Sequence, residues 1–327
     1  MSKLVTIFGG SGFVGRYIAQ RMARAGWRVR VAVRRPNEAI FVRTYGVVGQ
    51  VVPVFANIRD DRSVREVIHG ADAVINCVGT FDAGGKNNFE AVQELGAGRI
   101  ARIAAEEGAA RLVHISAIGA DSESESRYAQ TKAAGEAAIL EAFPEAVILR
   151  PSVVFGHEDA FFNRFANMAR FTPVLPLVGA DTKFQPVYVE DVATAAAKGA
   201  LGEAAPGIYE LGGPRVASFR ELMQTMLQVV RRRRLLVNMP FWAARIMATV
   251  LDGLQAATLG LFHNGVLTRD QVRQLGTDNV VAADARTLAD LDIEPTAMEA
   301  VLESYLYSLR PAGQYTALRE SARNLKT

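Results

Sequence analysis

Two groups of residues in this sequence have the types and the spacing that chemistry on a small molecule requires. The first is the glycine-rich segment 9–15, Gly-Gly-Ser-Gly-Phe-Val-Gly, which follows the apolar run Leu4–Phe8. The second is a Tyr-x-x-x-Lys pair, Tyr128 and Lys132. The i,i+4 spacing puts both side chains on one face of a helix. The ammonium of Lys132 would favour the phenolate and lower the pKa of Tyr128, which would make the phenol a usable general acid or base.

The glycine segment has the strand–turn–helix context in which such a motif binds a dinucleotide. Gly10, Gly12 and Gly15 fit the general fingerprint. Backbone N–H groups at the start of a helix approach the pyrophosphate, and any Cβ at Gly12 would block that approach. Lys132 would then hold the nicotinamide ribose. The alternative is a tight turn without a ligand, and we prefer the dinucleotide site because a strand pattern and a helix pattern flank the glycines.

The elements that must position these residues follow from the first half of the chain, where apolar runs alternate with helical stretches. The apolar runs lie at 4–8, 29–33, 51–55, 73–78, 111–116 and 146–149. Continuous apolar strands separated by amphipathic helices predict a parallel sheet that is covered on both faces. Right-handed crossovers then give a doubly wound α/β sheet of the Rossmann type, whose ligands bind at the carboxyl ends of the strands.

The end of the second predicted strand indicates which dinucleotide is bound. A site selective for NAD usually has an acidic residue there, but this chain has Arg34 and Arg35. Two guanidinium groups suit a 2′-phosphate, so we expect NADPH, and the alternative is a pair of ordinary solvated charges. The residues expected to contact the cofactor are Gly9, Ser11, Gly12, Phe13, Val14, Gly15, Arg34, Arg35, Asn57, Ile58, Cys77, Val78, Gly79, Ser116, Tyr128, Lys132, Pro151 and Val153.

Composition argues against several other classes of function. The formal net charge is only +3 over 327 residues, and no basic face with interleaved aromatic residues occurs, so we expect no nucleic acid partner. The four histidines lack the spacing of metal ligands, so we expect no metal site. The one cysteine, Cys77, excludes an internal disulfide, suits a reducing compartment, and is interpreted as a small packing residue. We find no signal peptide or transit segment before the first strand.

The pattern changes after Pro151, where helical segments replace most strands. We predict a Rossmann core over residues 1–156 and a smaller, mostly helical C-terminal subdomain over residues 157–327, with residues 184–213 returning to the sheet. One strand is expected at Gly207–Leu211. Three capping-box patterns predict helix starts, and they are Ser218 with Glu221, Thr268 with Gln271, and Thr296 with Glu299.

Two C-terminal segments carry concentrated charge or apolar surface. Arg231–Arg234 is expected to close the helix that begins near Ser218, and four arginines in a row suit an acidic partner or anionic lipid headgroups. The segment Pro240–Phe262 is interrupted by Arg245 and Asp252, so it is not a membrane span. Core packing is the default expectation for its apolar face, with a protein interface or an interfacial helix as alternatives. That face comprises Trp242, Ile246, Val250, Leu254, Ala257 and Leu261.

These motifs resemble those of the short-chain dehydrogenase/reductase superfamily, in its extended or atypical branch. The shared features are the spacing of Gly9, Gly12 and Gly15, and the Tyr-x-x-x-Lys pair in register after a strand that ends at Ser116. Further stretches are similar to one subfamily, the accessory dehydrogenase-like subunit of respiratory complex I, the NADH:quinone oxidoreductase. They are residues 45–50, 143–146, 151–152 with 155–156, 158–159 with 162–166, 185–189 with 191–192, and 267–270.

The resemblance implies a tightly held NADPH and a place on the peripheral arm of complex I, beside the quinone-site module. The implied partners are other complex I subunits of that arm near the quinone site, and anionic lipid headgroups are a further candidate. Because no presequence is found, we expect the cytoplasmic side of a bacterial inner membrane, or the mitochondrial matrix side for a processed chain.

One departure from catalytic extended members lies between Ser116 and Tyr128. Only twelve positions separate them, and the acidic run 121–126 fills most of these, whereas catalytic members resemble one another in a longer loop that shapes the substrate pocket. If the chain has any activity, Ser116, Tyr128 and Lys132 are its catalytic candidates. Our leading hypothesis is a non-catalytic accessory subunit stabilised by its cofactor. The alternatives are a free NADPH-dependent reductase or epimerase that uses Tyr128 and Lys132, and a sensor of the NADPH/NADP ratio.

Overall fold

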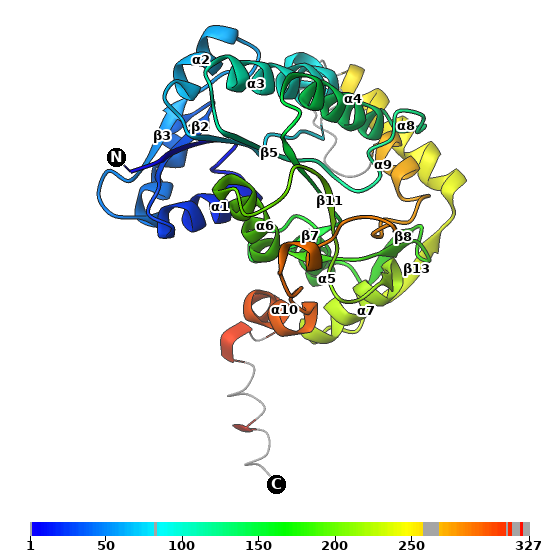
Figure 1. Ribbon diagram of the computed structural model, residues 1–327. Coiled ribbons are helices and arrows are strands. Elements are labelled where there is room, and N and C mark those ends of the chain that lie inside the picture. The colour runs from blue at the N-terminus through cyan, green and yellow to red at the C-terminus, as the bar shows by residue number, and fades with distance from the viewer. Residues whose placement is uncertain (1, 82–83, 258–267, 312, 316–320, 323–327) are drawn as a thin grey trace. The chain divides into compact units, whose positions relative to one another are not determined.

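The computed structural model in Figure 1 describes residues 2–81, 84–257, 268–311, 313–315 and 321–322. Two compact units can be distinguished. Unit 1 comprises Met1–Ser152, Val189–Gly212 and Val281–Pro295, and unit 2 comprises Val153–Tyr188, Gly213–Val280 and Thr296–Thr327. The chain therefore returns to unit 1 twice. The domain bounds expected from the sequence stay a prediction, and they do not include the second return at 281–295.

The centre of unit 1 is a seven-stranded sheet in which every pairing is parallel. The order β3-β2-β1-β4-β5-β6-β11 reverses between β1 and β4. In open α/β sheets the ligand crevice lies at such a reversal, at the carboxyl ends of the strands. The predicted doubly wound α/β fold is thus confirmed. The strands are β1 Leu4–Phe8, β2 Arg28–Val33, β3 Val51–Phe55, β4 Ala73–Asn76, β5 Arg111–Ile115, β6 Val147–Pro151 and β11 Gly207–Leu211.

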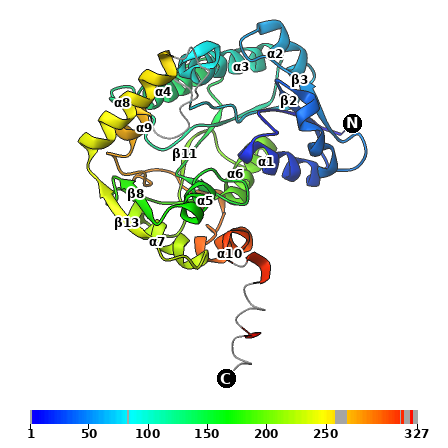
Figure 2. The ribbon, with the colours of Figure 1, turned by 180° about the vertical axis from the view of Figure 1, so that it is seen from behind.

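Helices cover both faces of this sheet (Figures 1 and 2). On one face lie α1 Phe13–Arg24 and α6 Val189–Leu201, and on the other lie α2 Asp61–Ile68, α3 Leu95–Glu106 and α4 Arg127–Ala142. Large apolar side chains fill the space between the second group and the sheet, and they include Phe8, Ile68, Ile100, Leu112 and Ile148. Each such side chain contributes roughly 1.5–3 kcal/mol through burial. This core holds α4, and with it Tyr128 and Lys132, against the ends of the strands.

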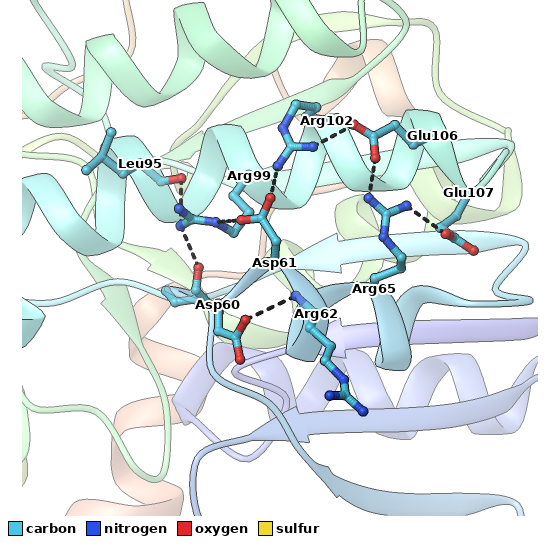
Figure 3. Close-up of polar contacts among 10 residues, drawn as sticks. Asp60, Asp61, Arg62, Arg65, Leu95, Arg99, Arg102, Glu106 and Glu107 are labelled. Carbon is cyan, nitrogen blue, oxygen red and sulfur yellow. Dashed lines mark hydrogen bonds and ion pairs between the residues drawn. The ribbon is translucent and has the colours of Figure 1, made fainter.

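Charged side chains also tie α2 to α3 (Figure 3). Asp61 accepts hydrogen bonds from Arg102 and, at 2.5 Å, from Arg99, while Glu106 lies 2.5 Å from both Arg102 and Arg65. The guanidinium groups hold the pKa values of Asp61 and Glu106 below their usual range. Because these groups lie at the surface, the network adds little stability. It does set the position of α2, which follows the loop after β3.

Unit 2 combines helices with short strands. Among its described residues, three two-stranded ribbons pair β7 Val154–Phe155 with β10 Val187–Tyr188, β8 Val174–Val178 with β13 Leu235–Met239, and β9 Lys183–Phe184 with β12 Ala217–Ser218. The helices are α5 Phe162–Phe171, α7 Phe219–Val229, α8 Phe241–Ala257, α9 Arg269–Gln274 and α10 Met298–Leu306. The core is rich in aromatic side chains and includes Phe155, Phe162, Phe184 and Phe219.

Two of the three predicted capping boxes are present. Ser218 caps α7 and Thr268 caps α9, each with the reciprocal side-chain bond three residues later. The third prediction, at Thr296, is wrong, because α10 begins two residues later without a side-chain cap. Glu299, the expected partner in that box, instead forms an ion pair with Arg215 at 2.9 Å.

The apolar face of α8 lies at the surface, contrary to the default expectation of core packing. Trp242, Ile246 and Val250 are 67%, 59% and 56% exposed, whereas Ala244 and Ala248 are fully buried. The small alanines let α8 approach its neighbours closely, and this leaves the large side chains outside. The side chains of the other predicted members, Leu254, Ala257 and Leu261, lie outside the described residues. Of the helices that the structure describes, none is both long enough and apolar enough to span a membrane.

Candidate dinucleotide site

The glycine segment forms a tight turn between β1 and α1. Gly9 has a φ of +73°, in the left-handed region that favours glycine, and the N–H of Gly12 donates to the carbonyl oxygen of Gly9 at 2.9 Å. α1 follows with Gly12 as its N-cap and no acidic residue in its first turn. Among the described residues, no side chain caps this helix. Its first N–H groups therefore point to an anion-binding position, which the helix dipole reinforces.

Close packing explains the third glycine of the motif. A Cβ at Gly15 would lie 2.4 Å from the carbonyl oxygen of Gly9 and 2.7 Å from the Cα of Gly10, so only glycine lets α1 start this close to the turn. A Cβ at Gly12 would meet only that same oxygen, at 3.2 Å. The chain's own packing thus constrains Gly12 less than Gly15, and the role of Gly12 in admitting a ligand stays a prediction.

Arg16 is a residue of this site that the sequence reasoning missed. Its Nε donates to the carbonyl oxygen of Gly12 at 3.3 Å and its Nη2 to that of Ser11 at 3.2 Å, and its guanidinium lies 5.1 Å from the ring centre of Phe41. The side chain therefore braces the glycine turn and puts a positive charge beside it. Arg16 could have been predicted from its position directly after Gly15, since a cation next to a phosphate-binding turn can attract the phosphate.

The two arginines after β2 differ in their surroundings. Arg35 forms an exposed ion pair with Glu38 at 3.0 Å. Arg34 is also exposed, but it forms no ion pair with any residue that the structure describes. Of the two candidates for a 2′-phosphate, Arg34 is therefore the one whose guanidinium is not already neutralised.

The chain after β3 and β4 passes the same end of the sheet. The N–H of Asn57 is bound by Ser63 Oγ at 2.9 Å, and the side chain of Ile58 packs near Gly96 of α3. After β4, Cys77 and Val78 are half-buried and lead to Gly79, where a Cβ would lie 4.0 Å from Lys132 Nζ. Burial raises the pKa of the Cys77 thiol to about 12, so it stays protonated, as expected for a packing residue.

Tyr128 and Lys132 lie on one face of α4, as their spacing predicts. The Tyr128 ring stacks on Phe81 with centres 5.4 Å apart and meets the edge of Phe89 at 5.9 Å. Lys132 Nζ lies 5.9 Å from the Tyr128 ring centre and donates to the carbonyl oxygen of Ile115 at 3.1 Å. Burial lowers the pKa of Lys132 to about 8, although Glu136 and Cys77 oppose this shift. The pair is thus assembled beside Gly79.

Ser116 is enclosed by other side chains. It is buried, and its hydroxyl donates to the carboxylate of Glu136 on α4. Arg150 holds the same carboxylate through three hydrogen bonds, from Nε to Oε1 at 3.0 Å and to Oε2 at 3.2 Å, and from Nη2 to Oε2 at 2.6 Å. Ala117, the next residue, has no hydroxyl. The hydroxyl of Ser116 is thus engaged by Glu136, a partner that the sequence reasoning missed.

The contacts of Arg150 continue to the edge of the sheet. Its Nη1 lies 3.6 Å from Glu210 on β11, and Glu210 Oε2 accepts from the N–H of Ala282 at 2.9 Å. The hydrogen bonds that Arg150 donates to Glu136 raise the pKa of Arg150. This buried network joins α4, β6, β11 and the returning segment 281–295, so Ser116 is part of the support of unit 1.

The last two predicted cofactor contacts, Pro151 and Val153, belong to different units of the chain. Pro151 ends β6, and its carbonyl oxygen accepts from the N–H of Ile118 at 3.1 Å. Val153 belongs to unit 2, where it packs against that unit's core.

His114 is buried beside Asn76, and burial lowers its pKa, so the imidazole is neutral. Within the described ranges, no group of three His, Cys, Asp or Glu side chains is placed to hold a metal ion.

The geometry fits a dinucleotide at the crevice between β1 and β4. The turn at Gly9, the uncapped start of α1 and the reversal of strand order are the features of the nucleotide-binding Rossmann class. Residues 5–212 match the NAD dependent epimerase/dehydratase family. The chain belongs to this family.

Several known proteins are similar to this chain over most of its length. The chain is 35% identical over 316 residues to NADH dehydrogenase (ubiquinone) 1 alpha subcomplex subunit 9, mitochondrial, of Arabidopsis thaliana, covering 95% of this chain and 79% of that protein. It is 31% identical over 312 residues to the NADH-ubiquinone oxidoreductase 40 kDa subunit of Neurospora crassa, covering 95% and 80%. It is also 32% identical over 241 residues to the ceramide reductase of Caulobacter vibrioides, covering 72% and 74%. The first two confirm the resemblance that the motifs indicated.

A solved structure, MoeE5 in complex with UDP-glucose and NAD, is similar in fold, with a TM-score of 0.67 and 15% sequence identity over 97% of this chain and 99% of that one. At this identity the likeness shows the fold alone. The family match by itself supports a nucleotide at the crevice.

Proposed function

We propose that this chain is an NADPH-binding accessory subunit of respiratory complex I, with a structural or assembly role beside the quinone-site module and no catalysis of its own. The observation that carries the proposal is the 35% identity to a subunit of the plant enzyme over 95% of the chain. A shared Rossmann sheet alone would give similarity over unit 1. The similarity to the plant subunit covers both units.

The cofactor that we propose is NADPH. The first turn of α1 would hold the pyrophosphate, Arg34 the 2′-phosphate and Lys132 the nicotinamide ribose. The other contacts are those expected from the sequence. Such a nucleotide supplies a hydride in the enzymes that use it. Here its contribution is stability, because a ligand present at a thousand times its dissociation constant adds about 4 kcal/mol to the free energy of unfolding.

The absence of catalysis is proposed from the state of the candidate residues. In the reductase mechanism considered for this chain, the hydroxyl of Ser116, directly after β5, would orient the substrate carbonyl. This hydroxyl instead donates to buried Glu136. Tyr128 is packed between Phe81 and Phe89. The pair therefore keeps its ability to hold the ribose and lacks the neighbour that would aim a carbonyl group at the phenol.

The test is Tyr128→Phe in the assembled complex, with the intact membrane enzyme assayed for NADH:quinone activity. We expect nearly unchanged activity and normal assembly. Losing a general acid would lower the rate by about a hundredfold or more. Such a loss in a normally assembled complex would show that Tyr128 is a working catalyst.

The partners that we propose are other subunits of the peripheral arm near the quinone site. The position is peripheral, on the cytoplasmic side of a bacterial inner membrane or on the matrix side for a processed mitochondrial chain. The names of the plant and fungal relatives, which describe subunits of a ubiquinone-reducing enzyme, support the proposed partners.

A free NADPH-dependent reductase is the second candidate, and the 32% identity to a ceramide reductase favours it. It would use Tyr128 as general acid and Lys132 on the ribose. The purified chain would then oxidise NADPH in the presence of a ketone derived from ceramide, and Tyr128→Phe would remove that turnover. Lack of turnover, together with association with a large NADH-oxidising complex, would exclude this candidate.

A further inference from the structure

One surface of unit 2 combines exposed apolar side chains with arginines. β13, which pairs with β8, leads into α8 (Figure 1). Val174 faces Leu235 across the pair, as Pro176 faces Val237. These four side chains are exposed, while Leu175 and Leu177 on the other side of β8 are buried. The ribbon therefore presents an apolar outer face. We call this face, with Phe171, Trp242, Ile246 and Val250, the apolar surface.

Arginines gather where the apolar surface begins. α7 ends at Val229, and Arg231–Arg234 follow it instead of closing it, with the turn made at Arg231. A groove beside α7 is lined by Arg220, Gln224, Leu227, Gln228, Arg232, Arg233, Arg234, Leu235 and Leu236. The groove thus leads from guanidinium groups directly to the apolar side chains of β13.

The arginines of the groove are not neutralised by the chain itself. In the part of the chain that is described, Arg232, Arg233 and Arg234 form no ion pair. Arg232 and Arg234 donate from Nε to carbonyl oxygens, of Leu309 at 3.1 Å and of Ala169 at 2.7 Å, so their positions are fixed. Burial, and after it the charges of Arg234 and Arg170, lowers the pKa of Arg232.

We propose that this surface docks on a membrane that contains anionic phospholipid, with headgroup phosphates at the arginine groove and the apolar surface at the boundary with the acyl chains. Residues 231–251 contain five arginines and no Asp or Glu. Cations followed by aromatic and aliphatic side chains match the order of a bilayer interface, where a layer of phosphate lies next to hydrocarbon. A protein partner would need an acidic and an apolar patch at the same spacing, whereas an anionic bilayer supplies both everywhere.

The two tryptophans of the chain allow a direct test. Trp27 is buried in unit 1 and Trp242 is 67% exposed, so the fluorescence of Trp27→Phe reports Trp242 alone. The Trp27→Phe variant, with its nucleotide bound, is mixed with vesicles of phosphatidylcholine. A second sample uses vesicles that also contain about one third phosphatidylglycerol. We expect a blue shift, and quenching by brominated acyl chains, with the anionic vesicles. No shift with either vesicle would overturn the proposal.

Charge variants test the groove. Changing Arg232, Arg233 and Arg234 to Gln should weaken sedimentation with anionic vesicles by roughly fivefold per arginine, or on the order of a hundredfold in total. The matched control changes three exposed arginines of unit 1, Arg24, Arg28 and Arg62, to Gln, and it should bind like the unaltered protein. Equal binding by both triple variants would contradict a role for the groove, as would equal binding to neutral vesicles.

Apolar variants test the remaining surface. Trp242→Ser should reduce vesicle binding by roughly tenfold while the nucleotide and the melting temperature are kept. Val48→Ser removes a fully exposed valine of unit 1 and is the control. A different outcome is that the arginine and Trp242 variants dissociate from the parent complex while the unaltered chain binds no vesicle. In that case the surface docks a protein, and the lipid proposal is wrong. Migration with the complex is measured separately, so this failure leaves the proposed function standing.

Discussion

The buried ammonium of Lys132 gives the stability of this protein a specific dependence on pH. Burial lowers the pKa of Lys132 from 10.5 to about 8 in the folded chain, and unfolding restores the ordinary value. Between these two values the unfolded chain binds more protons than the folded chain, so the free energy of unfolding rises with pH across that window. From about pH 7 to about pH 9 the gain from this one group is ~1.3 kcal/mol.

The assay compares the unaltered chain with Lys132→Met, which keeps the length of the side chain and removes its titration. Free energies of unfolding are measured by denaturant for nucleotide-free protein at both pH values. The difference between the two proteins should grow by ~1.3 kcal/mol in favour of the unaltered chain as the pH rises. The raised pKa of Cys77 acts in the opposite sense only above its ordinary value of 9.0, and both proteins contain it.

Lys86, whose side chain is exposed, provides the matched control. Lys86→Met should give the same dependence on pH as the unaltered chain. A difference between the unaltered chain and Lys132→Met that stays constant from about pH 7 to about pH 9 would refute the reasoning, because it would mean that burial does not disfavour the charged form of Lys132.

Three further predictions follow from the site. Arg34→Glu reverses a charge at the proposed 2′-phosphate and should lower NADPH affinity more than tenfold, since a charged hydrogen bond contributes about 1.5–3 kcal/mol. Mass spectrometry of the released nucleotide checks this prediction, with Arg62→Glu as the control. Recovery of NAD(H) alone from the unaltered protein would contradict it. Gly15→Ala places a Cβ 2.4 Å from a carbonyl oxygen and should lower the melting temperature and nucleotide content together, whereas Gly84→Ala meets open space and should change neither. Glu136→Gln leaves a partly buried guanidinium without its carboxylate and should lower the free energy of unfolding by about 3 kcal/mol in denaturant titrations; an unchanged value would show that the buried network contributes no net stability.

The sheet of unit 1 could be predicted because its strands are buried on both faces. A strand such as β1, whose five residues are all buried, must be apolar throughout, and such a run is readable in the sequence. The ribbons of unit 2 could not be predicted in this way. β7, β9, β10 and β12 have two residues each, which is too short for any periodic pattern to show.

In the candidate site too, residues whose roles depend on local spacing were predictable, and residues whose roles depend on distant partners were not. Gly15 and Lys132 were predicted because local spacing sets their roles, in a turn and on one helix face. The partner of Ser116 is twenty residues away on α4, and nothing near the serine indicates it. The apolar stripe of α8 was readable, but its direction was not, because the buried Ala244 and Ala248 decide which side packs inward.

The central claim is that this chain is a nucleotide-holding subunit of an NADH:quinone oxidoreductase. The most direct measurement is native electrophoresis of membranes solubilised in mild detergent, with the chain detected by antibody and the complex by NADH oxidation in the gel. The account predicts that the chain migrates with the large NADH-oxidising band and that NADP(H) is recovered from it. Migration of the whole population as a free protein of about 35 kDa, with the band intact, would contradict the claim.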